Sequence, residues 1–215
     1  MNDEETGALT AGGHAFGKAH GAQPADTFGG APESEDLHLQ GFGWLNDEEE
    51  IARGHITTSG IEGAWSNNPT SWSHDYFRIL FKYDFELVKS PAGAQQWTPI
   101  NPDPADMAPD ARDPSIKVQT MMTTADMALK MDPGYRRISE RFLANPEQLD
   151  DAFARARFKL CHRDMGPKVR YMGPEVPDET LIWMDPVPAG NTPSDASVAA
   201  FKSAILGSGL TVSEL

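Results

Sequence analysis

The residues best suited to chemistry are a single histidine and the two glycines before it, Gly12-Gly13-His14. Neutral imidazole is a good ligand for iron, and consecutive glycines remove side-chain bulk, so that a flat group could approach the backbone closely. The plainer interpretation is a histidine at a helix end that is hydrogen-bonded to a carbonyl group. From the tripeptide alone we favour this interpretation, because lone histidines usually have a structural role.

Long and specific blocks of sequence surround this tripeptide and continue along the chain. They are Asn2-Asp3-Glu4-Glu5-Thr6, Ala11 to Ala22 (AGGHAFGKAHGA), Ile56 to Glu62 (ITTSGIE), Lys89 to Ala94 (KSPAGA), Met121 to Asp126 (MMTTAD), Phe158 to Pro167 (FKLCHRDMGP) and Tyr171 to Pro177 (YMGPEVP). In this order they resemble the proximal-histidine region of catalase-peroxidases and the segments that follow it. The Gly-Gly-His motif is also similar to that of bacterial and plant-type haem peroxidases. The resemblance covers essentially the whole chain.

The resemblance implies a triad of His14, Asp126 and Trp65. In such peroxidases the histidine binds the haem iron through one ring nitrogen and donates through the other to a buried aspartate, which also accepts from an indole. A ligand histidine needs such an acceptor to fix its tautomer, and an indole can only donate. The tryptophan, close to the haem, can also supply an electron. Alone, Asp126 is better explained as a helix cap or surface acid and Trp65 as a core aromatic; together and in family order, they favour the triad.

Four more residues are implied to contact the cofactor. Gly13 adjoins the ligand, and Ser59 matches a position at the haem edge near a propionate, where a hydroxyl can donate. Without the resemblance, Ser59 is equally well explained as a turn serine. Lys18 and His20 follow the ligand closely, and we expect them to meet the propionates.

The resemblance also implies a catalytic role for Arg163. Its block is similar to the family segment with a mobile arginine, which swings toward a covalent Trp-Tyr-Met adduct and supports the catalase reaction. An arginine stays charged and can stabilise a tyrosinate. In isolation, His162-Arg163-Asp164 is typical of a solvated helix end. The neighbouring Cys161 is expected to be a buried small residue without a thiolate role.

Composition limits the partners and the compartment. With 32 acidic and 18 basic residues the formal net charge is −14, which disfavours nucleic acid and membrane surfaces as partners. No apolar run approaches the length of a membrane-spanning helix. The single cysteine excludes an internal disulfide, and we expect a cytoplasmic protein.

The elements that must position these residues are mainly helices joined by long loops. We expect helices at 2–10, 73–83, 124–130, 133–143, 146–161 and 196–206, and long loops at 18–58, with a solvated acidic stretch at 46–50, and at 91–114. The fold class is therefore mainly α, a haem-peroxidase-like helical fold that is incomplete. We expect the proximal half of a haem domain over 1–183, a linker over 184–197, and the start of a truncated second domain over 198–215.

The function implied by the resemblance is that of a catalase-peroxidase with haem b. Such an enzyme removes hydrogen peroxide by dismutation or by oxidising a small organic donor, and this chain would supply the proximal side of the haem. The family's distal Arg-aromatic-aromatic-His arrangement is not found in the 215 residues. We therefore expect a fragment that by itself binds haem weakly or not at all and has no appreciable catalase activity.

Two alternatives remain open. The first is a truncated, catalytically inactive peroxidase-derived protein with a haem-binding or structural role. The second is the family's own haem-free C-terminal domain, which the intact set of His14, Trp65 and Asp126 argues against. Full-length relatives are expected to be homo-oligomers.

Overall fold

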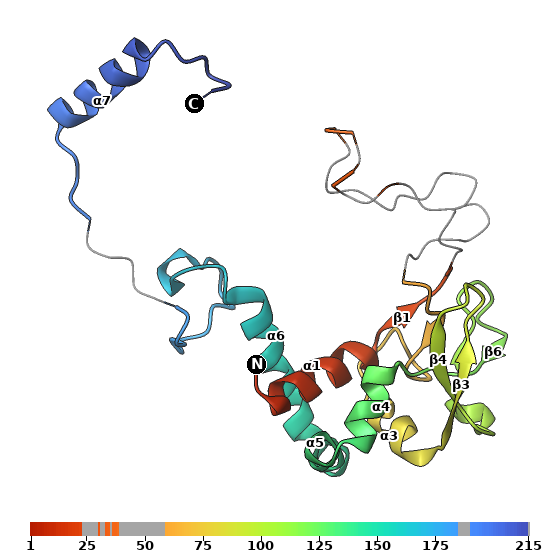
Figure 1. The fold of residues 1–215 in the computed structure, drawn as a ribbon. Helices are drawn as coiled ribbons and strands as arrows, with labels where there is room; N and C mark the ends of the chain where they lie inside the picture. The colour runs from red at the N-terminus through yellow and green to blue at the C-terminus, as the bar shows by residue number, and fades with distance from the viewer. Residues whose placement is uncertain (23–29, 31–32, 35, 39–58, 185–189, 215) are drawn as a thin grey trace. The chain divides into compact units, whose positions relative to one another are not determined.

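The computed structural model describes residues 1–22, 30, 33–34, 36–38, 59–184 and 190–214. Helices predominate among these residues, with short strand pairs between them (Figure 1), so the prediction of a mainly α fold is confirmed. No helix in the described ranges combines the length and the apolar character that crossing a bilayer requires. The acidic stretch predicted at 46–50 lies outside the described residues.

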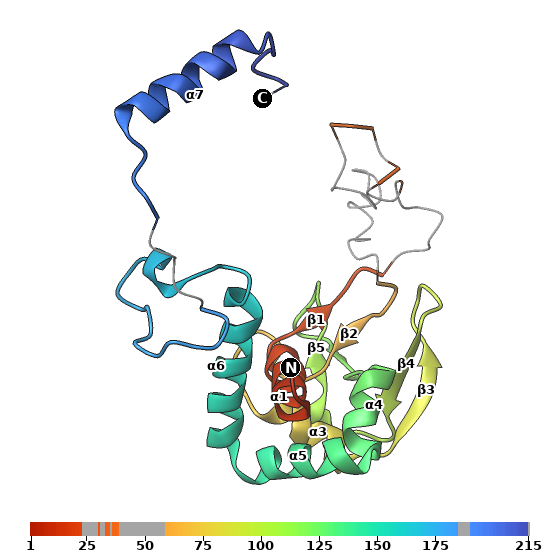
Figure 2. The same ribbon diagram turned by 60° about the vertical axis from the view of Figure 1, so that its left-hand side comes forward.

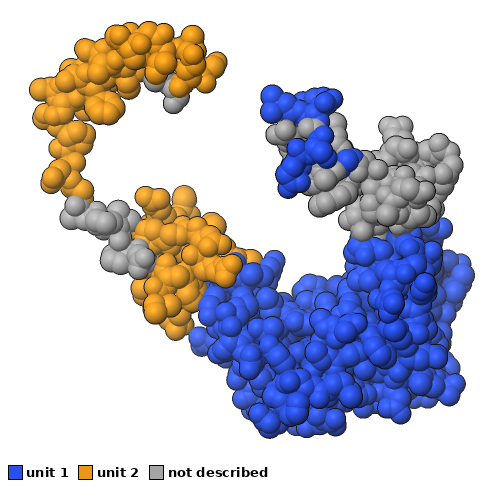
Figure 3. Space-filling model, in the orientation of Figure 1, with its two compact units in different colours: residues 1–160 blue, residues 161–215 orange. Residues whose placement is uncertain are grey.

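The chain divides into two compact units, residues 1–160 and residues 161–215 (Figure 3). The first unit contains the buried hydrophobic cluster. The domain bounds that we expected, 1–183, 184–197 and 198–215, stay a prediction.

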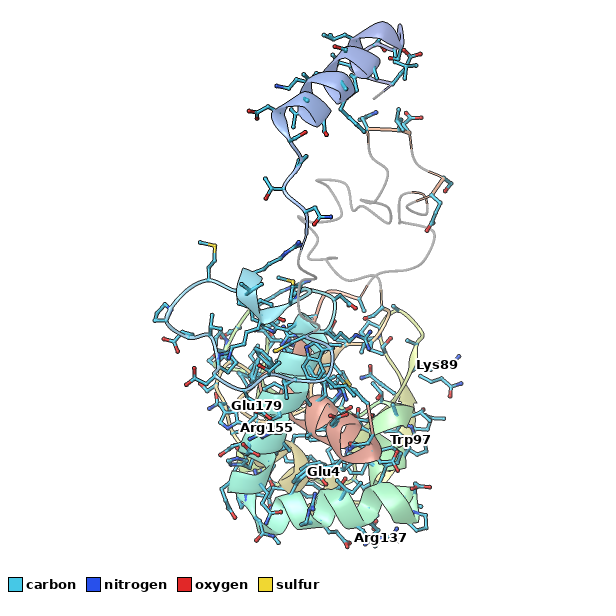
Figure 4. The ribbon with its side chains drawn as sticks, turned by 90° about the vertical axis from the view of Figure 1, so that its left-hand side faces the viewer. Glu4, Lys89, Trp97, Arg137, Arg155 and Glu179 are labelled. Carbon is cyan, nitrogen blue, oxygen red and sulfur yellow. The ribbon has the colours of Figure 1, made fainter. Side chains whose placement is uncertain are left out.

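Helix α1 (Asp3–Ala15) begins with a capping box. The backbone nitrogen of Glu5 donates to Asn2 Oδ1 at 2.8 Å, and the backbone nitrogen of Asn2 donates to Glu5 Oε2 at 2.9 Å. Two donors that a helix start would otherwise leave unpaired are thereby satisfied. Glu4, labelled in Figure 4, pairs with Arg141 of a later helix at 2.8 Å and fixes the same end of α1.

The C-terminal end of α1 differs from the prediction. We expected the helix to end near Thr10, but it continues to Ala15 and includes both glycines of the Gly-Gly-His motif. The reason is packing against α6 (Pro146–His162), since a Cβ at Gly12 would lie 2.1 Å from a ring carbon of Phe153. Gly12 therefore allows α1 and α6 to pack closely against each other.

Besides α6, helices α3 (Asp75–Lys82) and α5 (Pro133–Ala144) pack against α1, and α4 (Thr124–Met131) packs against α3 and α5. Figures 1 and 2 show α1 beside α3 and α5, with α4 against α5. Helix α3 is shorter than the 73–83 expected, whereas α4, α5, α6 and the later helix predicted at 196–206 lie within one or two residues of their predicted ends. The buried cluster is formed by residues of these helices and of α6, together with residues of the segments before α3 and α4: Ala8, Ala11, Trp65, Tyr76, Phe77, Ile79, Leu80, Met121, Met122, Leu129, Phe142 and Leu149.

The described residues also contain three antiparallel strand pairs that the sequence did not predict. They are β1 (Lys18–Ala19) with β2 (Gly63–Ala64), β3 (Phe85–Lys89) with β4 (Gln95–Pro99), and β5 (Ala108–Pro109) with β6 (Lys117–Val118). The prediction of loop was therefore wrong where β1 lies in 18–58 and where β4 and β5 lie in 91–114. The hairpin β3–β4 turns through Gly93, whose φ of 85° is readily adopted by glycine.

A buried carboxylate joins the loop after β4 to helix α3. Asp106, in the 3₁₀ turn η2 (Pro104–Asp106), accepts from Arg78 and Lys82 at 2.7 Å each and from the Tyr83 hydroxyl at 2.5 Å. Burial raises the pKa of Asp106, but these three donors outweigh it and lower the pKa from 3.8 to about 2. The ionised carboxylate therefore stabilises the folded unit.

The second unit carries a 3₁₀ turn, η3 (Lys168–Arg170), and helix α7 (Asp195–Gly207), which Ser194 caps through the backbone nitrogen of Ser197 at 3.2 Å. Helix α7 matches the predicted helix at 196–206. Cys161 is exposed near the end of α6, so the expectation that it is buried was wrong.

The two glycines of α1 make a matched pair for a stability test. We expect Gly12→Ala to lower the free energy of unfolding by about 1–3 kcal/mol, because the new methyl group overlaps the Phe153 ring. Gly13→Ala meets nothing within 4 Å, and we expect it to be neutral or to stabilise the chain by up to about 1 kcal/mol. Urea denaturation followed by circular dichroism measures both. Equal effects of the two substitutions would contradict this account of the helix packing.

The lowered pKa of Asp106 predicts a pH dependence. Its contribution to stability is complete above the ordinary pKa of 3.8 and is lost as the pH falls toward the folded value of about 2. We expect Asp106→Asn to lower the free energy of unfolding at pH 7 and to flatten its decline between about pH 4 and pH 2. Asp151→Asn, which removes an exposed partner of Arg155, is the control with little expected effect. An unchanged acid limb in Asp106→Asn would overturn the assignment.

Candidate functional site

The centre of the candidate site is the carboxylate of Asp126, which is fully buried. Asp126 is the third residue of α4 and forms a capping box with Thr123. The backbone nitrogen and the hydroxyl of Thr123 both donate to Asp126 Oδ2 at 2.7 Å, and the backbone nitrogen of Asp126 donates back to the Thr123 hydroxyl at 3.3 Å. The start of α4 thus fixes where this carboxylate lies.

Backbone pairing brings three distant segments to this carboxylate. The chain leaves α1, enters β1 and pairs with β2, so that Trp65 follows β2 directly beside the end of α1. The Ser66 hydroxyl donates to the carbonyl oxygen of Ala15 at 2.8 Å and closes this junction. The backbone nitrogen of Met121 donates to the carbonyl oxygen of Ala64 at 2.8 Å and brings in the segment that leads to α4.

Close approach of this third segment depends on Gly63. Its φ is 132°, and a Cβ there would lie 3.0 Å from the Met121 side chain. Behind it, Trp97 on β4, labelled in Figure 4, exchanges two backbone hydrogen bonds of 2.8 Å with Met122. Strand β4 therefore also holds the segment that leads to α4.

The three residues of the predicted triad meet in the structure. The indole nitrogen of Trp65 donates to Asp126 Oδ2 at 2.9 Å, and Nε2 of His14 lies 3.2 Å from Asp126 Oδ1. The imidazole of His14 stacks on the indole of Trp65, with ring centroids 4.0 Å apart and planes 14° from parallel. Carboxylate, imidazole and indole thus form one packed group.

Tyr76 is a further member of this group. Its hydroxyl donates to Asp126 Oδ1 at 2.6 Å, and its ring meets the edge of the His14 imidazole at a centroid distance of 5.4 Å. Tyr76 lies on the inward face of α3 and is 1% exposed. We expected it in the helix predicted at 73–83 but did not predict its contact with Asp126.

The protonation states of the group follow from its hydrogen bonds. Burial raises the pKa of Asp126, but the nearby His14 together with the donors Tyr76 and Thr123 outweighs burial, and the net pKa is lowered. Burial, reinforced by the adjacent carboxylate, raises the pKa of Tyr76 well above its usual value. Asp126 is therefore ionised and can only accept hydrogen bonds.

These residues fit a flat metal-containing cofactor. His14 keeps one ring nitrogen that does not face Asp126, and its side chain is 25% exposed rather than enclosed. The space around the α-carbon of Gly13 is open, since an added Cβ would meet nothing within 4 Å. A carboxylate behind the imidazole is the usual arrangement of a metal-ligating histidine.

The other predicted cofactor-binding residues do not contact the Asp126 carboxylate. Lys18 is exposed on β1 and Ser59 is exposed before Gly60, whose φ of 76° marks a turn. His20 lies 2.6 Å from Glu62 Oε1 through Nδ1, and its buried Nε2 has no hydrogen-bond partner. His20 and Glu62 line a cavity of about 640 Å³ together with Pro91, Asp110, Arg112 and Asp113.

Arg163 belongs to the second unit and lies just after α6. Its side chain is exposed, and its Nε lies 3.7 Å from Asp164 Oδ2. Arg163 is thus a surface residue, as the pattern His162-Arg163-Asp164 predicts when it is considered without the resemblance.

Comparison with known proteins shows where the chain belongs. It is 75% identical over its whole length to the catalase-peroxidase of Erythrobacter litoralis (strain HTCC2594), and it covers 29% of that protein. It is 67% identical to the catalase-peroxidase of Sphingopyxis alaskensis and 57% identical to that of Phenylobacterium zucineum, again over the whole chain and 30% and 29% of those proteins. The chain thus spans less than a third of the length of these relatives. A sequence model described as peroxidase matches residues 1–145, well over half of the 215 residues, and the chain therefore belongs to the peroxidase family.

Proposed function

We propose that this chain supplies the proximal haem side of a catalase-peroxidase. The observation that carries the proposal is the buried Asp126 carboxylate, which lies 3.2 Å from an imidazole and accepts an indole hydrogen bond of 2.9 Å. The identity to catalase-peroxidases along the whole chain supports the same function. The reaction would be the removal of hydrogen peroxide, by dismutation or with a small organic electron donor.

In this proposal His14 would ligate the iron of haem b through one ring nitrogen, with Asp126 behind the imidazole. Asp126 holds the imidazole in one tautomer and makes it a stronger electron donor to the metal. Trp65, stacked on the imidazole at 4.0 Å, is placed to pass an electron toward the cofactor. The haem, when bound, supplies the redox chemistry that cleaves the O–O bond of peroxide.

The remaining predicted residues would contact the cofactor or act from the second unit. Gly13 leaves room beside the ligand, and Ser59 is exposed where a propionate could accept its hydroxyl. Lys18 is exposed and cationic, which suits a negatively charged propionate. His20, by contrast, already pairs with the carboxylate of Glu62. The catalytic role of Arg163 rests on its sequence block alone.

We further propose that these 215 residues alone have no appreciable catalase activity, because they contain no distal histidine and arginine to handle peroxide. A cytoplasmic location is part of the proposal.

Titration of the chain with haemin tests the role of His14. We expect weak binding, since only one face of the porphyrin is covered, and we expect His14→Ala to reduce the affinity about tenfold or more through loss of the iron ligand. His74→Ala is the matched control, because His74 is a partly exposed histidine that pairs with a different carboxylate, Asp150, at 2.8 Å. The Soret absorbance measures binding in all three proteins.

Equal affinity of the chain and His14→Ala, or an equal loss in His74→Ala, would contradict His14 as the ligand. The same samples can then be mixed with hydrogen peroxide. Robust oxygen release by the 215-residue polypeptide with haemin would refute the proposal that it is inactive alone.

A further inference from the structure

A second histidine of the first unit, His20, also pairs with a carboxylate. His20 follows β1 and Glu62 precedes β2. In this antiparallel pair Ala19 lies opposite Gly63, and the same register brings the next two side chains, His20 and Glu62, together. Nδ1 of His20 lies at hydrogen-bonding distance, 2.6 Å, from Glu62 Oε1. The pairing of β1 with β2 therefore builds this contact.

The Glu62 carboxylate is itself fixed by further hydrogen bonds. Its Oε2 accepts from the backbone nitrogens of Gly21 at 2.7 Å and of Ala22 at 3.2 Å. The buried side chain of Gln96 on β4 pairs with the Glu62 backbone in both directions, accepting from its nitrogen at 2.9 Å and donating to its carbonyl oxygen at 2.8 Å. Because the carboxylate is the acceptor in this arrangement, Nδ1 of His20 is the donor and carries the proton.

The lone pair of the neutral His20 imidazole is then on Nε2. Free histidine prefers the opposite tautomer, with its proton on Nε2, so Glu62 selects the less common form. The side chain of His20 is 10% exposed, and within the described part of the chain its buried Nε2 has no hydrogen-bond partner. A buried polar atom of this kind is usually satisfied by water or by a ligand.

His20 lines a cavity of about 640 Å³, a volume typical of small-molecule sites. The lining also includes the carboxylates of Glu62, Asp110 and Asp113 and one cation, Arg112. Hydrogen bonds from the backbone nitrogens of Asp113, at 3.0 Å, and Arg112, at 2.8 Å, lower the pKa of Asp110, which is therefore ionised. A lining with more negative than positive charge favours a ligand that is positively charged.

We propose that this cavity binds a small organic amine that donates a hydrogen bond to Nε2 of His20, and that Glu62 is the positioning residue that keeps the imidazole proton on Nδ1. That the amine is the organic electron donor of the enzyme rests on the proposed function, whereas the tautomer and the binding do not. A haem propionate, the partner that the sequence predicts for His20, accepts from Nε2 only when the ring takes up a second proton.

Nitrogen-15 NMR of the full 215-residue chain without haem, at alkaline pH where imidazoles are neutral, tests the tautomer. We expect the proton of His20 on Nδ1. In Glu62→Gln we expect it on Nε2. The side-chain oxygen of the new glutamine is needed by the backbone nitrogens of Gly21 and Ala22, so its NH₂ group faces Nδ1 and takes the lone pair there.

Two controls accompany this measurement. His74, whose Nε2 lies 2.8 Å from Asp150, should carry its proton on Nε2 in every sample. Glu86→Gln removes the same charge at an exposed position of β3 and should leave the tautomer of His20 unchanged. A merely structural role of Glu62 predicts no inversion of the tautomer in Glu62→Gln.

Benzylamine and benzoate, which share a ring and differ in charge and in donors, test the ligand class. We expect benzylamine to shift the Nε2 resonance of His20 and benzoate to leave it unchanged. In Glu62→Gln the affinity for benzylamine should fall by about fivefold or more, through loss of the acceptor and of one charge. Glu86→Gln should bind benzylamine as the unaltered chain does.

A proton on Nε2 of His20 in the unaltered chain, or one that stays on Nδ1 in Glu62→Gln, would overturn the role of Glu62. Binding of benzoate in place of benzylamine would make the cavity an anion site, and no shift with either compound would leave water as the partner of Nε2. Both results contradict the amine site. If Glu62→Gln does not fold, the tautomer and the two compounds decide the question in the unaltered chain. Because no haem is present, these outcomes are independent of the haemin titration that tests the proposed function.

Discussion

The whole site depends on one ionised carboxylate that is held in the core. Taking a carboxylate out of water costs several kcal/mol unless its oxygens are hydrogen-bonded. Asp126 meets this requirement through hydrogen bonds from three residues, namely Trp65, Tyr76 and Thr123, and His14 Nε2 lies 3.2 Å from its Oδ1. Each comes from a different segment of the first unit, so the carboxylate both organises the site and ties these segments together.

This constraint explains the roles of the surrounding elements. Helix α1 carries His14 near its end, the strand pair β1–β2 positions Trp65, and α3 carries Tyr76. The capping box at the start of α4 fixes the position of the Asp126 carboxylate, which these three side chains meet. A second buried carboxylate, Asp106, has a comparable structural role between α3 and the loop after β4, but its donors are two cations and a phenol.

Local chemistry made most helices predictable. Asn2 caps α1, Pro133 and Pro146 occupy first turns, and Gly207 ends α7, so each of these signals acts within a few residues of the helix that it defines. The end of α1 was not predictable in this way. Two glycines after Thr10 indicate a helix end, but the contact that keeps Gly12 helical comes from Phe153, far along the chain.

The site could be predicted in part. The resemblance named His14, Trp65 and Asp126, and the structure brings them together. Considered alone, Asp126 suggested a helix cap, and it is indeed in a capping box while also being the buried acceptor; the pattern Thr123-x-x-Asp126 could have signalled this. Nothing local indicates the hydroxyl contact of Tyr76, 50 residues before its acceptor.

The exposure of Cys161 at the end of α6 could not be predicted from its sequence neighbours either. The inward positions of this helix are Leu149 and Ala156, seven residues apart. Cys161 follows five residues later, which turns it about 140° away from Ala156 around the helix. A small apolar residue therefore lies exposed where composition alone favours burial.

A double-mutant cycle between Trp65→Phe and Asp126→Ala tests the central claim most directly. The free energies of unfolding of the chain, the two single variants and the double variant give the coupling between indole and carboxylate, and effects on the α4 cap cancel. The account predicts a coupling of about 1.5–3 kcal/mol, as for a buried hydrogen bond to a charged group. Additive effects, within about 0.5 kcal/mol, would contradict it.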